Sequence, residues 1–315
     1  MIRIVFLDYL RILSVILVIL QHYKFFQGQN HNISKYLIDA TGNLGVSIFL
    51  LISGYIISHI INKYNKIQDF LIARFLRIYP LFFLAFIMYY ILLNTNPDAS
   101  FYNIFLQLIL PIADFSQSYT LIGIEWSLRV EFLFYIILAI LFYSNNLSIL
   151  KIFLLQIFNV IFLFLYHNYS KSNPYICLTL ANLNYVLIGS IIYLYFNDNC
   201  KKILNLTILI TSIFITYLVF IKIYNNDFII YFSGIIGLII FLLSFVFRDY
   251  FKNFKIIKIF SDLTFPLYLF HQFFNNLIFK NNFYNIIVAI LFSYLVHKMI
   301  EEKIANFKNK IIKKI

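Results

Sequence analysis

Several ionisable residues stand inside apolar stretches of this sequence, where a charge is costly and therefore a candidate for function. Arg11 and His22 are separated by 11 residues, close to three helical turns and roughly 16 Å along a helix axis. Both side chains are thus predicted to lie on nearly one helix face. Histidine is the usual general base near neutral pH, so His22 is a candidate for proton transfer. The alternative is a snorkelling arginine and an interfacial histidine.

Two further features could assist such a site. Asp8 lies one turn before Arg11 and is expected either to cap the helix or to pair with that arginine. Arg74 and Arg77 are also one turn apart, so they can converge on one anion, and arginine forks suit phosphates. The alternative for this pair is ordinary positive charge at a cytoplasmic surface.

A later apolar run opens with several charged residues. Glu125 and Arg129 have the i,i+4 spacing of an ion pair, and Trp126, the only tryptophan, suits a membrane interface. This interpretation leaves Glu131 unexplained, because it lies deeper in the apolar stretch. Farther along the chain, His271 follows Pro266, which interrupts backbone hydrogen bonding and can open a polar niche. The alternative is a histidine hydrogen-bonded between helices.

The elements that must position these residues are membrane-spanning helices. Hydrophobic residues make up 62% of the 315 residues, charged residues 12%, and mean hydropathy is +0.85. Such a composition excludes a soluble enzyme, a disordered chain, a coiled coil and a disulfide-rich secreted domain. Two cysteines and the absence of CxxC and HExxH motifs suggest no metal site. The net charge of +12 is spread between apolar runs, so we expect no nucleic-acid partner.

Continuous apolar runs predict an all-α bundle of about ten spanning helices. The runs cover 5–23, 43–61, 76–93, 124–143, 147–166, 175–196, 203–222, 228–247, 260–279 and 283–300. A shorter run at 101–113 is predicted to be re-entrant or interfacial. Small residues such as Gly45 and Gly54 favour tight helix packing.

The charge distribution predicts that both termini are cytoplasmic. Of the 25 lysines and arginines, only Lys24, Lys35, Lys171, Lys222 and Lys280 then fall on the outer side, and Arg129 lies within a span. We expect one membrane domain over 1–315 without an appended soluble domain. Its basic tail, 301–315, is predicted to lie on the inner leaflet.

These motifs together resemble acyltransferase family 3, a family of membrane proteins. The resemblance rests on Arg11-x10-His22, Gly45-Val46-x-x-Phe49-x-x-x-Ser53-Gly54, Arg74-x-x-Arg77-Ile78-Tyr79-Pro80, Trp126-Ser127-Leu128-x-Val130-Glu131, Tyr268-Leu269-x-His271 and the ending Ile300-Glu301. It covers about 5 to 302. Arg129 and Phe132 depart from the family pattern, as does Lys303 in place of a frequent proline, and the first departure bears on substrate choice.

The resemblance implies transfer of an acyl group, usually acetyl, from acyl-coenzyme A to a sugar hydroxyl. The acceptor would be a surface glycan or its polyprenol-linked precursor, at the cell (inner) membrane. His22 would be the essential histidine with Arg11 as its partner, and Arg74 and Arg77 the conserved cytoplasmic pair. No tightly bound cofactor is implied, since acetyl-CoA serves as the donor substrate.

Physical chemistry suggests roles for the other polar residues. Either Glu131 or Asp8 can orient or charge-stabilise the histidine, and the sequence does not choose between them. Supporting or substrate-binding positions are predicted at Trp126, Ser127, Tyr268 and His271. Two alternatives are a transporter or flippase with His22, Glu131 and His271 as a proton relay, and a non-catalytic membrane partner. The lack of internal repeats counts against the first, and an intact His22 against the second.

Overall fold

The computed structural model describes residues 3–24, 31–61, 63–64, 66–93, 101–109, 123, 125–143, 147–168, 173–197, 202–223, 228–277 and 282–314. Every regular element in these ranges is helical, which confirms the predicted all-α class. The helices are α1 (Val5–His22), α2 (His31–Ile61), α3 (Ile67–Leu93), α4 (Phe101–Leu108), α5 (Glu125–Tyr143), α6 (Ile149–His167), α7 (Pro174–Asn197), α8 (Lys202–Ile223), α9 (Phe228–Val246), α10 (Lys255–Leu277), α11 (Asn282–Val296) and α12 (Glu302–Lys314). A 3-10 turn, Arg248–Tyr250, precedes α10, and a π turn, His297–Glu301, joins α11 to α12.

Helices coincide with all the apolar runs predicted from the sequence. Among the described residues, six helical stretches are long and apolar enough to cross a bilayer. They are Val5–His22, Ile38–Ile61, Ile67–Ile91, Ile149–His167, Pro174–Asn197 and Asn282–Lys308. The molecule is therefore a helical bundle with the character of a multi-pass membrane protein, whereas the total of ten spans and the cytoplasmic termini stay predictions.

Some helices begin well before the apolar runs that predicted them. α2 begins at His31 rather than near 43, and α3 begins at Ile67 rather than near 76. Hydropathy detects only the apolar part of a helix, so more polar turns at its start escape it. The earlier start places Arg74, which precedes the predicted run, on the same helix as Arg77. The short run at 101–113 contains α4, which ends at Leu108.

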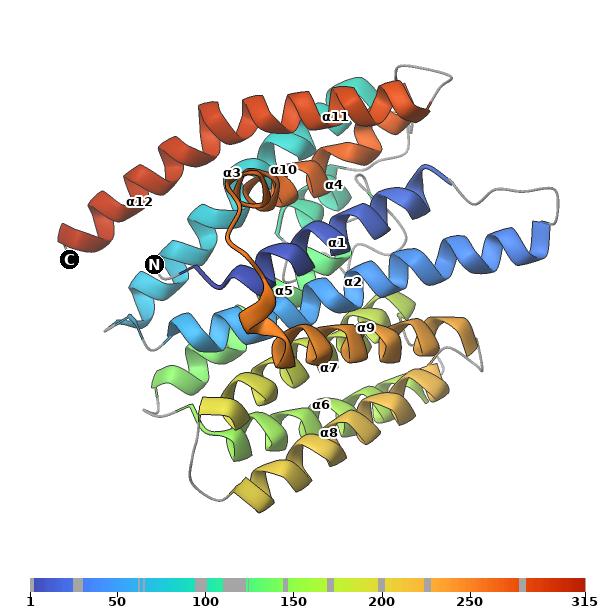
Figure 1. Ribbon diagram of the computed structural model, residues 1–315, viewed down its shortest axis with the longest axis vertical. Helices are drawn as coiled ribbons and strands as arrows, with labels where there is room; N and C mark the ends of the chain where they lie inside the picture. Colours follow the sequence, from blue (N-terminus) through green and yellow to red (C-terminus); the bar gives the residue numbers. More distant parts are fainter. Residues whose placement is uncertain are drawn as a thin grey trace.

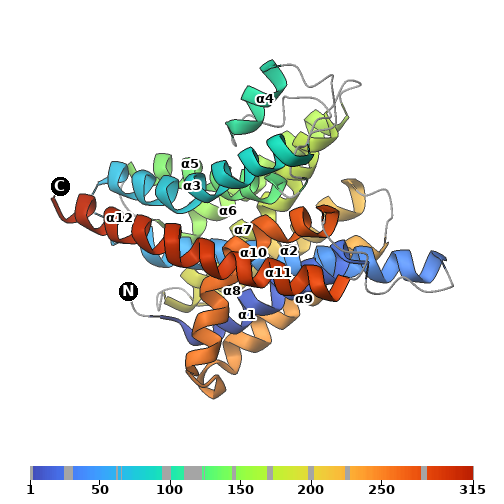
Figure 2. The same ribbon diagram turned by 90° about the horizontal axis from the view of Figure 1, so that it is seen from above.

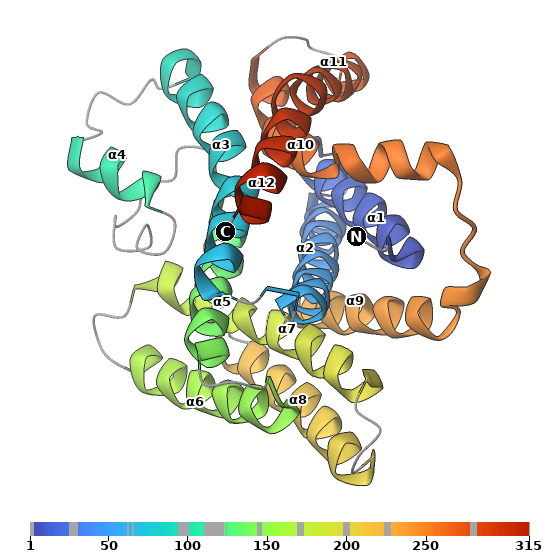
Figure 3. The same cartoon turned by 90° about the vertical axis from the view of Figure 1, so that its left-hand side faces the viewer.

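The helices run side by side and form a bundle (Figure 1), which Figure 3 shows nearly end-on. The centre is formed by α2 and α7, because 78% of the apolar window of each is buried, against 28% for α6. α1 packs on α2, and α10 packs on α1 although they are far apart in sequence. α4 stands apart from the other helices at one edge (Figure 2).

Glycines allow the two central helices to touch backbone to backbone. A Cβ atom added to Gly54 of α2 would overlap the Val186 carbonyl of α7, and one added to Gly189 would overlap the Leu51 carbonyl. Ser190 Oγ closes the contact by donating a hydrogen bond of 3.1 Å to the Gly54 carbonyl. This geometry confirms the tight packing predicted at Gly54.

Gly54→Ala is expected to destabilise the bundle by about 1–3 kcal/mol, because neither backbone can yield without shifting a helix. Gly42→Ala is the matched control on the same helix, since its new methyl group would meet only the flexible Gln21 side chain. Thermal unfolding of both purified variants in one detergent checks the difference. Equal unfolding temperatures would show that the contact is not tight.

The N-terminus and the segment before α10 lie at one end of the bundle. Arg3 Nη2 donates a 3.1 Å hydrogen bond to the Lys258 carbonyl, and Tyr9 donates one of 3.0 Å to the Lys252 carbonyl. Single cysteines can be introduced into a variant that lacks Cys177 and Cys200 and labelled in intact cells with a thiol reagent that does not cross the membrane. Cysteines in 62–74 and 248–258 are expected to stay unlabelled. Positions in 94–123, most of which lie outside the described residues, are expected to react. Labelling of 248–258 from outside would refute the predicted orientation.

Candidate active site

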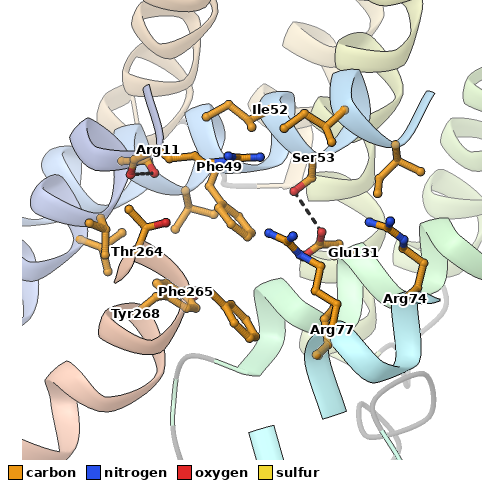
Figure 4. Close-up of a pocket in the computed structure, with 17 residues that line it drawn as sticks. Arg11, Phe49, Ile52, Ser53, Arg74, Arg77, Glu131, Thr264, Phe265 and Tyr268 are labelled. Carbon is orange, nitrogen blue, oxygen red and sulfur yellow. Dashed lines mark hydrogen bonds between the residues drawn. The ribbon is translucent and has the colours of Figure 1, made fainter. Parts of the chain in front are cut away.

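A pocket with a charged cluster and an otherwise largely apolar wall lies inside the bundle between α1, α2, α3, α5 and α10 (Figure 4). Its volume is about 60 Å³, and its charged lining residues are Arg11, Arg74, Arg77 and Glu131. Ser14, Ser53, Thr264 and Tyr268 add hydroxyl groups, and aliphatic and phenylalanine side chains form the remaining wall. Three arginines against one carboxylate make the lining positive, which favours an anionic ligand.

Arg11 of α1 lines the pocket and forms an ion pair with Asp8. Its Nη1 lies 3.1 Å from Asp8 Oδ1, as the i,i+3 spacing predicted. The buried Asp8 carboxylate also accepts hydrogen bonds from Arg3 and from Ser261 Oγ, the latter at 2.7 Å. The cap prediction for Asp8 is wrong, because α1 begins at Val5 with Ile4 in the N-cap position. The carboxylate therefore serves as a crosslink between α1 and α10.

Arg3 completes this crosslink outside the apolar part of α1. Its Nη1 lies 3.0 Å from Asp262 Oδ1 of α10. Partial burial lowers the pKa of the Arg3 guanidinium, but hydrogen bonds and Coulombic attraction from Asp8 and Asp262 outweigh burial, so its pKa is raised overall. Arg3 remains charged and keeps the Asp8 carboxylate compensated.

Glu131, which the sequence left unexplained, is a wall of the pocket. Ser53 Oγ of α2 donates a 3.2 Å hydrogen bond to Glu131 Oε1, and the Tyr135 hydroxyl donates another from one turn later on α5. Figure 4 shows Glu131 between Ser53 and the arginines of α3. Sequence reasoning missed Tyr135, although its i,i+4 spacing from Glu131 is a signal that could have found it.

Arg74 and Arg77 line the same pocket, as their spacing predicted, but in different settings. Arg74 is only 4% exposed, and its guanidinium lies over the rings of Phe70 and Tyr135, at 5.7 and 5.9 Å. Arg74 Nε is buried and has no hydrogen-bond partner within the described part of the chain. Arg77 is exposed. A buried guanidinium with a vacant donor favours binding of an anion.

Tyr268 forms the side of the pocket opposite α3. Its hydroxyl lies 2.7 Å from Ser127 Oγ of α5, and its ring stacks on Phe49 of α2 with centroids 5.8 Å apart. Ser127 is fully buried and does not line the pocket, so it acts by fixing Tyr268. Trp126 is half-buried against the core and also lies outside the pocket lining.

His22 and His271 form a second group, at the far end of α1. Their ring centroids are 5.1 Å apart. His271 is fully buried, and its Nδ1 donates to the Tyr268 carbonyl at 2.8 Å, which leaves Nε2 without a partner among the described residues. Asn275 Nδ2 fixes the end of α1 by donating a 3.0 Å hydrogen bond to the His22 carbonyl.

The structure gives different surroundings to two residues that the sequence placed on one helix face. Arg11 lines the pocket, whereas His22 does not. Val18, which precedes His22 by one turn, is a lining residue, so the pocket ends one turn short of the histidine pair. His271 was predicted as a supporting residue, and its contact with His22 is consistent with that role.

The positive charge of Arg129 is balanced by a carboxylate within the protein. Its Nη2 lies 3.4 Å from Glu125 Oε1, the predicted i,i+4 ion pair, and 2.9 Å from Gln107 Oε1 of α4. All three side chains are buried. Arg129 therefore attaches α4 to α5 and does not line the pocket.

No group of three or more His, Cys, Asp or Glu side chains suited to a metal ion occurs among the described residues. The fold and the site define a multi-pass membrane protein with an internal, positively charged pocket. The sequence profile described as the acyltransferase domain of family 3 matches residues 4–297, so the chain belongs to acyltransferase family 3. Searches of curated proteins and of solved structures gave no match.

Proposed function

We propose that the protein transfers an acetyl group from acetyl-CoA to a hydroxyl group of a sugar in a surface glycan or its polyprenol-linked precursor. The observation that supports this most directly is the paired placement of Arg74 and Arg77 in one pocket with a vacant buried donor. Coenzyme A is a cytoplasmic polyanion, and Arg74 and Arg77 are predicted to face the cytoplasm. Phosphate groups on the donor would supply the negative charge that the lining lacks.

His22 is the general base in this proposal. A sugar hydroxyl is a poor nucleophile at neutral pH, so a base must remove its proton as it attacks. The hydroxyl oxygen forms a bond to the thioester carbonyl carbon, and His22 takes the proton. The carbon–sulfur bond then breaks, and the coenzyme A thiolate takes the proton back from the imidazolium. The products are an O-acetyl sugar and free coenzyme A.

In this proposal the acetyl-bearing arm of the donor lies along α1, between the arginines of α3 and His22. The pocket extends from the arginines of α3 past Arg11 to Val18. A volume of about 60 Å³ holds only a few water molecules, so the thin arm of the donor must widen the pocket to reach His22. Arg11 would stand beside this arm, and Glu131 with its partners Ser53 and Tyr135 would fix the opposite wall.

A proton-relay transporter receives no support from these contacts. His22 and His271 touch each other, but among the described side chains no hydrogen bond links either histidine to Glu131. Glu131 instead belongs to the group around Arg74 and Arg77. We therefore keep the acetyltransferase as the proposal.

The test uses membranes that contain the protein, isotopically labelled acetyl-CoA and glycan precursors extracted from the source cells. Label is expected to appear in the glycan fraction as an alkali-labile ester. Mass spectrometry of glycans from a deletion strain should show the loss of one acetyl mass from the same acceptor. Labelled acetyl-CoA that neither binds to these membranes nor donates its acetyl group would refute the proposal.

A further inference from the structure

The C-terminal helix α12 continues α11 through the π turn and lies against α3, the helix that holds Arg74 and Arg77 (Figures 1 and 3). The sequence predicted only that this basic tail rests on the inner leaflet. A helix bound solely to a lipid surface would direct its lysines toward headgroups. Contact with α3 instead places one side of α12 against the helix that carries both arginines.

Lys308 is the lysine on this side. It is half-buried, whereas Lys303 and Lys310 on the same helix are exposed. Lys308 is close enough to Arg74 and Arg77 for both to repel its charge. Lys308 does not itself line the pocket, but it adds a third cation, from a second helix, to the two arginines that do.

This arrangement is unfavourable in the absence of an anion. Like charges repel, and partial burial reduces the screening by water that would relieve them. Within the described part of the chain, no carboxylate lies within 4 Å of Lys308, Arg74 or Arg77. Glu131, which lines the pocket and accepts hydrogen bonds from Ser53 and Tyr135, supplies one negative charge against these three positive charges. A ligand with more than one negative charge would satisfy all three cations.

We propose that Lys308 is a third binding residue for the phosphate groups held by Arg74 and Arg77, so that α12 forms part of the donor site. This inference rests on the proposed function, because it takes the anion to be that of coenzyme A. An ammonium group suits this position, since it needs no fixed fork geometry on a half-exposed side chain. The C-terminal helix then has a binding role beyond membrane attachment.

The test measures coenzyme A binding by calorimetry to the full-length protein in neutral detergent. Lys308→Ala is expected to weaken binding about tenfold, the lower end for a charge-assisted hydrogen bond. Lys308→Gln, which keeps the stem, should weaken it similarly, and Lys308→Arg should largely restore it. Lys303→Ala is the matched control and should bind as the wild type does.

Different failures have different meanings. If Arg77→Ala weakens binding while Lys308→Ala and Lys308→Gln bind normally, the inference about Lys308 is overturned and the proposed function stands. If the wild type binds no coenzyme A, both fail. The same measurements in nanodiscs with and without anionic lipid show whether the anion that Lys308 binds is a lipid headgroup. Equal losses for Lys303→Ala and Lys308→Ala, seen only with anionic lipid, would assign α12 to membrane attachment and overturn the inference.

Discussion

His22→Ala is expected to lower the acetyl-transfer rate by about 10²–10⁴-fold, the usual contribution of a general base, while the protein inserts and accumulates normally. His22 is half-buried at the end of α1, and its backbone carbonyl, rather than its ring, accepts the hydrogen bond from Asn275. Truncating the ring therefore leaves that anchor intact. The rate per folded molecule, measured with labelled acetyl-CoA, checks the prediction.

Two other histidines provide controls for this experiment. His167→Ala removes a half-buried histidine at the end of α6, outside the pocket lining, and should leave the rate unchanged. His271→Ala removes a fully buried ring and its hydrogen bond to the Tyr268 carbonyl. Its main effect should therefore be a lower unfolding temperature, with a smaller loss in the rate per folded molecule than His22→Ala shows.

The pH dependence gives an independent readout. A base must be unprotonated to act, so the wild-type rate should rise with pH through the range where histidine titrates, whose ordinary pKa is about 6.5. The residual rate of His22→Ala should lack this rise. A folded His22→Ala protein that transfers acetyl groups at the wild-type rate would end the general-base assignment.

The helices could be predicted from the sequence because the membrane imposes their length. Twenty or so apolar residues in succession have no other solution in a bilayer, and each predicted run became a helix. The early starts of α2 and α3 could not be predicted in this way. Polar residues outside the hydrocarbon region can be helical or irregular, and only packing against neighbouring helices decides.

The contacts of the site could likewise be predicted only in part. Contacts within one helix, such as Asp8 with Arg11 and Glu125 with Arg129, follow from i,i+3 and i,i+4 spacing and were predicted. Contacts between helices, such as Ser127 with Tyr268 or His22 with His271, depend on which helices are neighbours. Spacing along the chain says nothing of that. The sequence left open whether Glu131 or Asp8 supports His22 for this reason. In the described contacts, Asp8 pairs with Arg11 and Glu131 accepts hydrogen bonds from Ser53 and Tyr135.

Arg77→Ala is expected to weaken acetyl-CoA binding by about 10- to 150-fold, the value of one charge-assisted hydrogen bond of roughly 1.5–3 kcal/mol. Arg77 is exposed, so its removal should leave the unfolding temperature nearly unchanged. Arg74→Ala should weaken binding at least as much but also destabilise the protein, because the buried guanidinium packs over Phe70 and Tyr135. Calorimetry and thermal unfolding on the same samples separate the two effects.

Two substitutions decide whether the pair binds phosphate or merely anchors the topology. Arg77→Lys keeps the positive charge but loses the fork, so it should restore binding only partly. Arg248→Ala removes another exposed arginine that is predicted to be cytoplasmic and lies outside the pocket lining, and it should not affect affinity. If the Arg74 and Arg77 variants bind acetyl-CoA as tightly as Arg248→Ala does, at equal protein levels, the pair has only a topological role.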